Sequence, residues 1–157
     1  MKSEKKNEYT LRITQANKAG LIVILYEIAI EYVNEAIEAG TTDIESMKTA
    51  AMNAARCIEE MQNNLHYEYE LAKVLNRMYV NMKNTLRAAY VSGDVSGLDG
   101  VAVELNKLRC SYEKIADTDT SGPVMIHTQT VLAGMTYSKD RVLDSLTNEC
   151  SNRGYRV

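Results

Sequence analysis

The sequence is poor in the residues that interrupt helices. It contains one proline, Pro123, and eight glycines among 157 residues. Proline removes a backbone donor and glycine costs conformational entropy in a helix, so their scarcity leaves long stretches in which helical hydrogen bonding is undisturbed. Apolar residues make up 45% of the chain, which is enough for one buried core. We therefore expect one folded domain built mainly of helices.

The chain is also poor in cysteine. Cys57, Cys110 and Cys150 are odd in number, lie far apart and form no Cys-x-x-Cys pair. A disulfide framework and a zinc site both need paired cysteines at suitable spacing. The sequence indicates neither, and we interpret the three cysteines as buried or idle thiols.

An excess of positive charge is absent as well. The formal net charge is −3, whereas proteins that grip nucleic acid usually present a clearly basic face. No apolar run approaches the roughly 20 residues that cross a bilayer. Residues 1–8 are charged and are not followed by the apolar core of a signal peptide. We expect no nucleic-acid partner, no insertion into a membrane and a cytoplasmic location.

What the sequence does contain is apolar residues at three- and four-residue steps, which is the period of one helix face. Four such runs follow one another, at 17–39, about 43–66, 71–92 and 98–117. Consecutive helices with short connections pack as antiparallel neighbours around a shared core. The predicted fold class is therefore all-α: an antiparallel up-and-down four-helix bundle with a less ordered C-terminal tail.

Capping residues stand where these helices are expected to begin and end. Asn17 is a typical N-cap for the first helix, and Thr42 or Asp43 for the second. Gly40 and Gly93 are typical of helix C-termini. The turn-forming stretch 118–123 then ends the bundle. Three regions result: a mobile N-terminal segment at 1–16, the bundle at 17–117, and a linker and tail at 118–157 that is partly ordered or disordered, with one amphipathic stretch around 142–146.

The residues needed for catalysis or metal binding do not occur in a recognisable pattern. A di-iron site in a helical bundle needs Glu-x-x-His pairs, but neither His66 nor His127 has an acidic residue three positions earlier. No glycine-flanked nucleophile occurs, and Gly93, Gly97 and Gly100 do not match a phosphate-binding loop. We predict a protein that is not an enzyme and holds no metal or cofactor.

Binding through an apolar groove remains as the natural function. The run 17–39 is apolar around most of its circumference, so one neighbouring helix does not cover it. The chain has ten tyrosines and eight methionines, which suit a wet boundary and an adaptable contact surface, respectively. For Tyr26 and Tyr32, groove lining and core packing are equally compatible with the pattern. Four methionines are interpreted as core: Met47, Met61, Met78 and Met82.

The first predicted helix carries a recognisable run: Ala16 to Ile30 reads Ala-Asn-Lys-Ala-Gly-Leu-Ile-Val-Ile-Leu-Tyr-Glu-Ile-Ala-Ile. This run is similar to Ala-Ser-Pro-Glu-Glu-Leu-Ile-x-x-Leu-Tyr-Asp-Gly-Ala-Ile, which is typical of the flagellar secretion chaperones of the FliS family. The sequence resembles that family over about Tyr9 to Ala116. Lys18, Gly20 and Ile28 depart from that pattern. Further similarity lies in Asp43-Ile44-Glu45, Leu71-Ala72, Tyr79, Met82 to Leu86, Leu105, Leu108-Arg109 and Tyr112.

The resemblance implies a cytosolic chaperone that binds the disordered C-terminal region of flagellin and prevents its premature polymerisation. It also implies delivery of flagellin to components of the flagellar type III export apparatus, and an N-terminal segment that lies over the groove until the partner displaces it. An extended segment would present Tyr9, Leu11 and Ile13 on one side. The expected partner-binding residues are Tyr9, Leu11, Ile13, Leu21, Ile22, Leu25, Tyr26, Ala29 and Tyr32.

Two other classes of function stay open. The broad apolar first helix would also suit a structural bundle that acts only by pairing with a second copy in a homodimer. An enzyme with an unrecognised site is the third class, because missing motifs are weak evidence. The tail stretch around 142–146 would, by analogy alone, shield the same groove.

Overall fold

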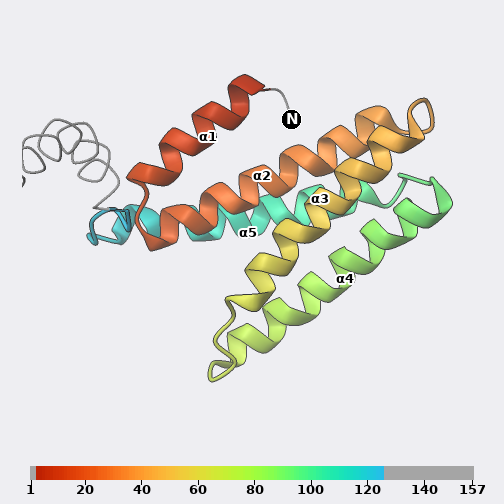
Figure 1. Ribbon diagram of the computed structural model, residues 1–157. Helices are drawn as coiled ribbons and strands as arrows, with labels where there is room; N and C mark the ends of the chain where they lie inside the picture. Colours follow the sequence, from red (N-terminus) through yellow and green to blue (C-terminus); the bar gives the residue numbers. More distant parts are fainter. Residues whose placement is uncertain (1–2, 126–157) are drawn as a thin grey trace, which may run out of the picture. The chain divides into compact units, whose positions relative to one another are not determined.

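The computed structural model describes residues 3–125, and over this range the chain is all-helical, with five helices and no strand. The chain divides into two units, Met1–Val124 and Met125–Val157, and the description below concerns the first. The predictions for residues 126–157, including the amphipathic stretch around 142–146, lie outside the described residues. Figure 1 shows the helices in order: α1 Ser3–Gln15, α2 Lys18–Ala39, α3 Ile44–Asn63, α4 Glu70–Ser92 and α5 Leu98–Thr118.

The expected capping residues are found at the ends of α2, α3 and α4. The Asn17 side chain accepts a hydrogen bond from the Gly20 amide at 2.7 Å, and the Asp43 side chain accepts one from the Ser46 amide at 3.0 Å. The hydrogen bonds that Asp43 accepts from the hydroxyl and the amide of Ser46 hold the pKa of the Asp43 carboxyl below its usual range. Gly93 ends α4 with φ at 78°, a left-handed conformation that costs glycine little. The predicted starts of α2 and α3 are therefore confirmed.

The N-terminal segment is a helix, so the extended conformation predicted for it is wrong. Tyr9 and Ile13 are one helical turn apart and both are half-buried, whereas Leu11 is 61% exposed. Salt bridges link this helix to Glu27 and Glu31 of α2, and local sequence does not reveal these contacts. The alternation of Tyr9, Leu11 and Ile13 is therefore only a weak indication of an extended segment, and the contacts with α2 outweigh it.

The core is formed where α2 packs against α3 and α5, and α3 packs against α4. Small residues dominate the contact between α2 and α3, including Ala29, Ala36, Ala50 and Ala54, all at most 4% exposed. Their size lets the two helices approach closely. Met47, Met61 and Met82 are buried as predicted, and Met78 packs against the core from a partly exposed position.

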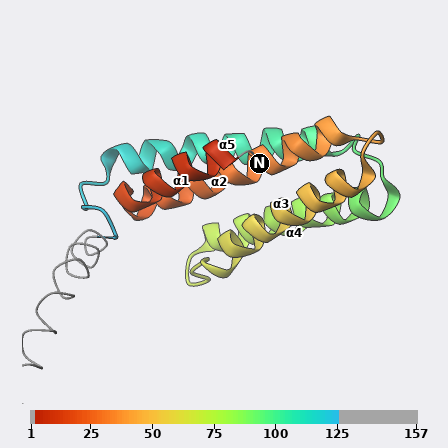
Figure 2. The same ribbon diagram turned by 45° about the horizontal axis from the view of Figure 1, so that its top comes forward.

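The helices form two pairs that converge at one end. Figures 1 and 2 both show α3 and α4 close to α2 near the turn from α2 to α3, and diverging from α2 and α5 toward the loop between α3 and α4. We call the converging side the closed end and the diverging side the open end. The beginning of α2 and the end of α3 lie at the open end, so apolar residues there are not fully covered.

Candidate partner-binding groove

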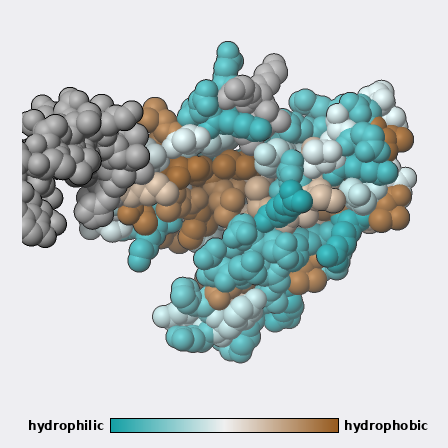
Figure 3. Space-filling view, in the orientation of Figure 1, coloured by the Kyte–Doolittle hydropathy of each residue, from teal (hydrophilic) through white to brown (hydrophobic). Residues whose placement is uncertain are grey.

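A groove lies at the open end, with a volume of about 420 Å³. Figure 3 shows hydrophobic surface along α2 at this place, between α1 and the pair formed by α3 and α4. We call it the α2 groove. Its lining residues come from four helices, the loop after α3 and the segment after α5: Lys18, Leu21, Ile22, Leu25, Met61, Asn64, Leu65, His66, Tyr79, Tyr112 and Val124.

The α2 side of this groove follows from the sequence of α2. Leu21, Ile22 and Leu25 fall on one face of the helix, and each is half-buried. The opposite wall comes from the last turn of α3 and the residues after it, where Leu65 is also half-buried. Four apolar side chains, Leu21, Ile22, Leu25 and Leu65, therefore still reach solvent. A partner that covers them with apolar side chains of its own is stabilised, because apolar surface is removed from water.

Tyr79 and Tyr112 line the groove, and Tyr26 lies beneath them in the core. The hydroxyls of Tyr26 and Tyr79 form a hydrogen bond, and neither residue is more than 1% exposed. The ring centroids of Tyr26 and Tyr112 are 5.5 Å apart in a tilted arrangement. Burial raises the pKa of Tyr79 to about 12 and raises the pKa of Tyr26 further, so both stay neutral near pH 7. The pair gives the floor a fixed shape without placing a charge in it.

The polar residues of the groove stand at its rim. Lys18 comes from the first turn of α2, and Asn64 and His66 follow α3, where all three are exposed. An apolar floor with a polar rim is the surface that fits an amphipathic helix laid into a groove. The groove is therefore suited to bind a partner through burial of apolar surface, with few polar contacts to orient it. Among its lining residues, we identify no group that is placed for a chemical reaction.

The segment after α5 closes one edge of the groove. The amide of Val124 donates to the Ala16 carbonyl at 3.1 Å, which ties the chain after α5 to the junction between α1 and α2. At the same junction, the Asn17 side chain donates to the Asp119 carbonyl at 3.1 Å. Asn17 thus caps α2 and also fixes the end of α5.

α1 lies on a different face of α2. Lys5 pairs with Glu31 at 2.6 Å, and Arg12 pairs with Glu27 at 2.6 Å. At 100° per residue, these glutamates lie about 80–160° around the helix from Leu21 and Leu25, so they face a different direction. No residue of α1 lines the α2 groove. Both ion pairs are partly exposed, and such pairs contribute only about 0–1 kcal/mol each.

The structure separates the nine expected partner-binding residues into three groups. Leu21, Ile22 and Leu25 line the α2 groove together. Tyr26 and Ala29 are fully buried in the core and present no surface to a partner, while Tyr32 is half-buried beside a separate hollow that also includes Lys6 and Glu35. The remaining three, Tyr9, Leu11 and Ile13, lie on α1 outside the groove.

Sequence reasoning missed the groove residues that lie outside α2. Leu65 continues the apolar period of α3, which predicts it inside that helix, although α3 ends at Asn63. The sequence gives no reason to place Tyr79 and Tyr112 in a groove beyond their similarity to a known family. Their hydroxyls were a usable signal, because a tyrosine often keeps its ring in apolar surroundings and its hydroxyl near a polar partner.

Metal binding and membrane crossing are two other functions that the described residues could in principle support. In the stretch 3–125, no group of three or more His, Cys, Asp or Glu side chains is placed to hold a metal ion. No helix of that stretch is both long and apolar enough to cross a membrane.

A family of known proteins matches most of the chain. Residues 1–119 match the family described as flagellar protein FliS. The match includes all five helices and every residue that lines the α2 groove except Val124. No curated protein matches the sequence.

Proposed function

We propose that this chain, which belongs to the flagellar protein FliS family, is a chaperone that holds the disordered C-terminal region of flagellin in the α2 groove. In this proposal it works in the cytoplasm, prevents premature polymerisation of flagellin and delivers it to the flagellar type III secretion apparatus. The proposal includes an antiparallel up-and-down bundle of α2 to α5, open at one end to receive the partner. No catalytic step is part of it.

The observation that carries the proposal is the half-buried apolar face of α2. Leu21, Ile22 and Leu25 reach solvent in a groove of about 420 Å³, next to apolar residues of three other helices. A disordered segment with apolar residues at helical spacing gains by folding against such a surface, and it is masked while bound. Folding of the flagellin segment on binding costs conformational entropy, which weakens the complex. Release therefore needs a competing partner and no further energy source.

We include α1 as the displaceable element. It packs mainly against α2, through two partly exposed ion pairs. Ile24, Ile28 and Glu31 follow one another at one-turn steps on the covered face of α2. Departure of α1 would therefore add apolar surface on α2 beyond the groove. In this proposal, α1 covers α2 with the residues Tyr9, Leu11 and Ile13 until the flagellin segment displaces it.

Binding to flagellin from the same organism tests the proposal. We expect a one-to-one complex by size-exclusion chromatography with light scattering, and by calorimetry, that is lost when the C-terminal segment of flagellin is deleted. Equal binding to the truncated flagellin would show that the site on flagellin is wrong. Absence of binding to full-length flagellin would overturn the proposal.

Two variants locate the site on the chaperone. Leu21→Asp places a charge in the groove at a half-exposed position, so we expect it to weaken flagellin binding at least tenfold while the circular dichroism spectrum is unchanged. Leu11→Asp, at a position 61% exposed on α1, is the matched control and should bind as tightly as the parent or more tightly. Removal of residues 1–13 should leave the fold intact and raise the affinity.

The alternative is a bundle that acts only through homodimerisation. It draws on the same half-exposed residues, because a second copy would also cover them. Light scattering separates the two: a stable dimer that persists in the presence of flagellin favours this alternative, and a dimer that flagellin dissociates favours the chaperone.

A further inference from the structure

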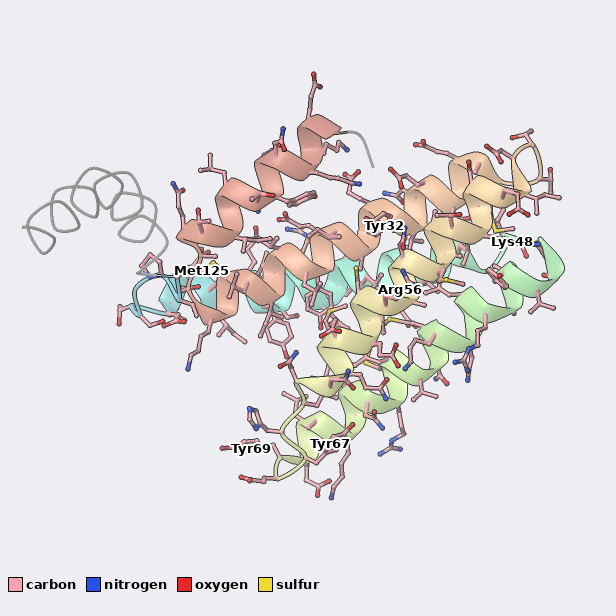
Figure 4. The ribbon with its side chains drawn as sticks, viewed as in Figure 1. Tyr32, Lys48, Arg56, Tyr67, Tyr69 and Met125 are labelled. Atoms are coloured by element: carbon pink, nitrogen blue, oxygen red, sulfur yellow. The ribbon has the colours of Figure 1, made fainter. Side chains whose placement is uncertain are left out.

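A second hollow lies between α3 and α4, and none of its lining residues lines the α2 groove. We call it the α3–α4 cleft. Its volume is about 390 Å³. Figure 4 shows Arg56 midway along α3, and Lys48 near the beginning of α3 close to the end of α4. The cleft and the proposed flagellin site therefore use different residues of α3 and α4.

The floor of the cleft is small and apolar. Ala51 and Ala55 of α3 leave space between the helices, and Leu86 of α4 is 1% exposed beneath them. Met52 and Tyr90 stand at the sides, with 42% and 37% of their surface exposed. A side chain of moderate size from a partner would bury apolar area here.

The walls of the cleft are cationic, on a protein whose net charge is −3. Arg56, Lys83 and Arg87 line it, and Glu59 is the one carboxylate among its lining residues. Lys83 and Glu59 approach no closer than 4.0 Å, which is a weak pairing. Within residues 3–125, the side chains of Arg56 and Arg87 make no hydrogen bond or ion pair. The two guanidinium groups come from different helices, and neither has a counter-ion in this described part of the chain.

A further cation extends the charge along the cleft. The ammonium of Lys48 lies 5.6 Å from the centroid of the Tyr90 ring, which holds it at the end of the cleft. Its nearest carboxylate, on Glu45, is 3.9 Å away and 90% exposed, so it screens Lys48 only weakly. The lining of α3 from Ala51 to Glu59 rises about 12 Å, or roughly two helical turns.

We propose that the α3–α4 cleft is a docking site for an acidic amphipathic helix of a partner protein. The guest would place carboxylates at one-turn spacing against Arg56 and Arg87 and an apolar side chain over Ala51 and Ala55. Arginine pairs with carboxylates through two parallel hydrogen bonds, which would fix the register of the guest. The site does not depend on the proposed function, because its residues are separate from the α2 groove.

A protein segment fits these features better than nucleic acid does. Phosphate backbones are bound by extended basic surfaces, and their affinity needs no apolar floor. Here the cations flank exposed Met52 and Tyr90, and the surface is only about two helical turns long. A groove between two helices with an apolar floor is the geometry of helix-in-groove recognition.

The test uses the full-length protein and a labelled synthetic helical peptide with glutamates four residues apart and leucines on the adjoining face. A second peptide has glutamine in place of each glutamate. We expect fluorescence anisotropy to detect binding of the acidic peptide, at least tenfold weaker binding of the glutamine peptide, and weakening of the acidic complex by added salt. Arg56→Glu with Arg87→Glu should weaken the acidic complex at least tenfold.

Arg77→Glu is the matched control, because Arg77 is an exposed α4 arginine that does not line the cleft. It should leave binding within twofold of the parent. Absence of binding, equal affinity for both peptides, or equal loss with Arg77→Glu would overturn the proposal. Displacement of the peptide by an equal concentration of a DNA oligonucleotide would show a general polyanion surface instead. Thermal unfolding followed by circular dichroism must show that the variants are folded, and Arg56→Ser with Arg87→Ser replaces the charge reversal if they are not.

Discussion

The closed and open ends of the helical unit are built from the same α2 helix, yet they differ in what α2 does. At the closed end, Ala29, Val33 and Ala36 are fully buried, because α3 approaches α2 closely there. At the open end, Leu21 and Leu25 are larger and only half-buried, because α3 and α4 diverge from α2. Leu21 and Leu25 thus leave more apolar surface exposed than Ala29 and Val33 do. Burial on this side of α2 therefore depends on the spacing of its neighbours, and the apolar pattern alone does not reveal the groove.

The largest expected effect is a cavity at the closed end. Leu98 is fully buried at the start of α5, so Leu98→Ala should lower the free energy of unfolding by about 2–5 kcal/mol in chemical denaturation. Leu21→Ala, the same change at a half-exposed position of the open end, should cost less than about 1 kcal/mol because little burial is lost. Equal costs for the two variants would contradict the contrast between the ends.

A pH titration tests the tyrosine pair at the floor of the groove. Burial raises the pKa of Tyr79 from 10.0 to about 12, and that of Tyr26 rises as well. The stability that this pair contributes is fully present below pH 10 and is lost as the pH rises through about 12, because the unfolded phenols ionise first. The loss from Tyr79 should reach about 3 kcal/mol. The double variant Tyr26→Phe with Tyr79→Phe should flatten this decline, whereas ionisation of both tyrosines near pH 10 in the native protein, seen by ultraviolet absorbance, would refute it.

Asn17 fixes the open end, and its loss should have a smaller effect. Asn17→Ala removes the cap on α2 and the hydrogen bond to the Asp119 carbonyl, so we expect a loss of about 0.5–2 kcal/mol. Asn84→Ala is a suitable comparison, since Asn84 is an exposed residue of α4 with no hydrogen bond in the described part of the chain. Urea denaturation of both variants should separate them, and equal stability would show that the cap is dispensable.

The smallest effect should come from loosening α1. Arg12→Gln removes the ion pair with Glu27 and should change the free energy of unfolding by less than about 1 kcal/mol. If α1 yields to the guest, the same variant should bind flagellin two- to fivefold more tightly by calorimetry. Lys6→Gln changes the net charge equally without breaking an ion pair and should leave the affinity unchanged. An unchanged affinity in Arg12→Gln as well would mean that α1 does not compete with the guest.

The helices could be predicted because their determinants are local. Asn17 and Asp43 accept hydrogen bonds from amides three residues later, and Gly93 supplies a left-handed residue, so each end depends on a few adjacent positions. Apolar residues at helical spacing then define the helices between those ends. α1 escaped this reasoning, because it is polar over most of its length and its position depends on ion pairs with residues 15 and 26 positions away in the sequence.

The candidate site could be predicted only on the α2 side. Leu21, Ile22 and Leu25 were expected there and line the groove, while Tyr26, in the adjoining turn, is fully buried. A rotation of 100° per residue separates a groove position from a core position, and single-sequence patterns do not fix which sector of an all-round apolar helix is covered. The cationic α3–α4 cleft was likewise invisible, since Arg56 and Arg87 read as ordinary solvated charges until their helices are paired.

By itself, the sequence determined that this protein is helical, where four of its helices begin, and that α2 carries more apolar surface than one neighbour can cover, because these properties follow from local hydrogen bonding and periodicity. Only the tertiary structure decided that α1 is a helix on α2, that the tyrosine pair lies in the core, and that the α2 groove opens between Leu25 and Leu65. The physical reason is that burial and pairing are properties of two surfaces, and the second surface comes from distant parts of the chain.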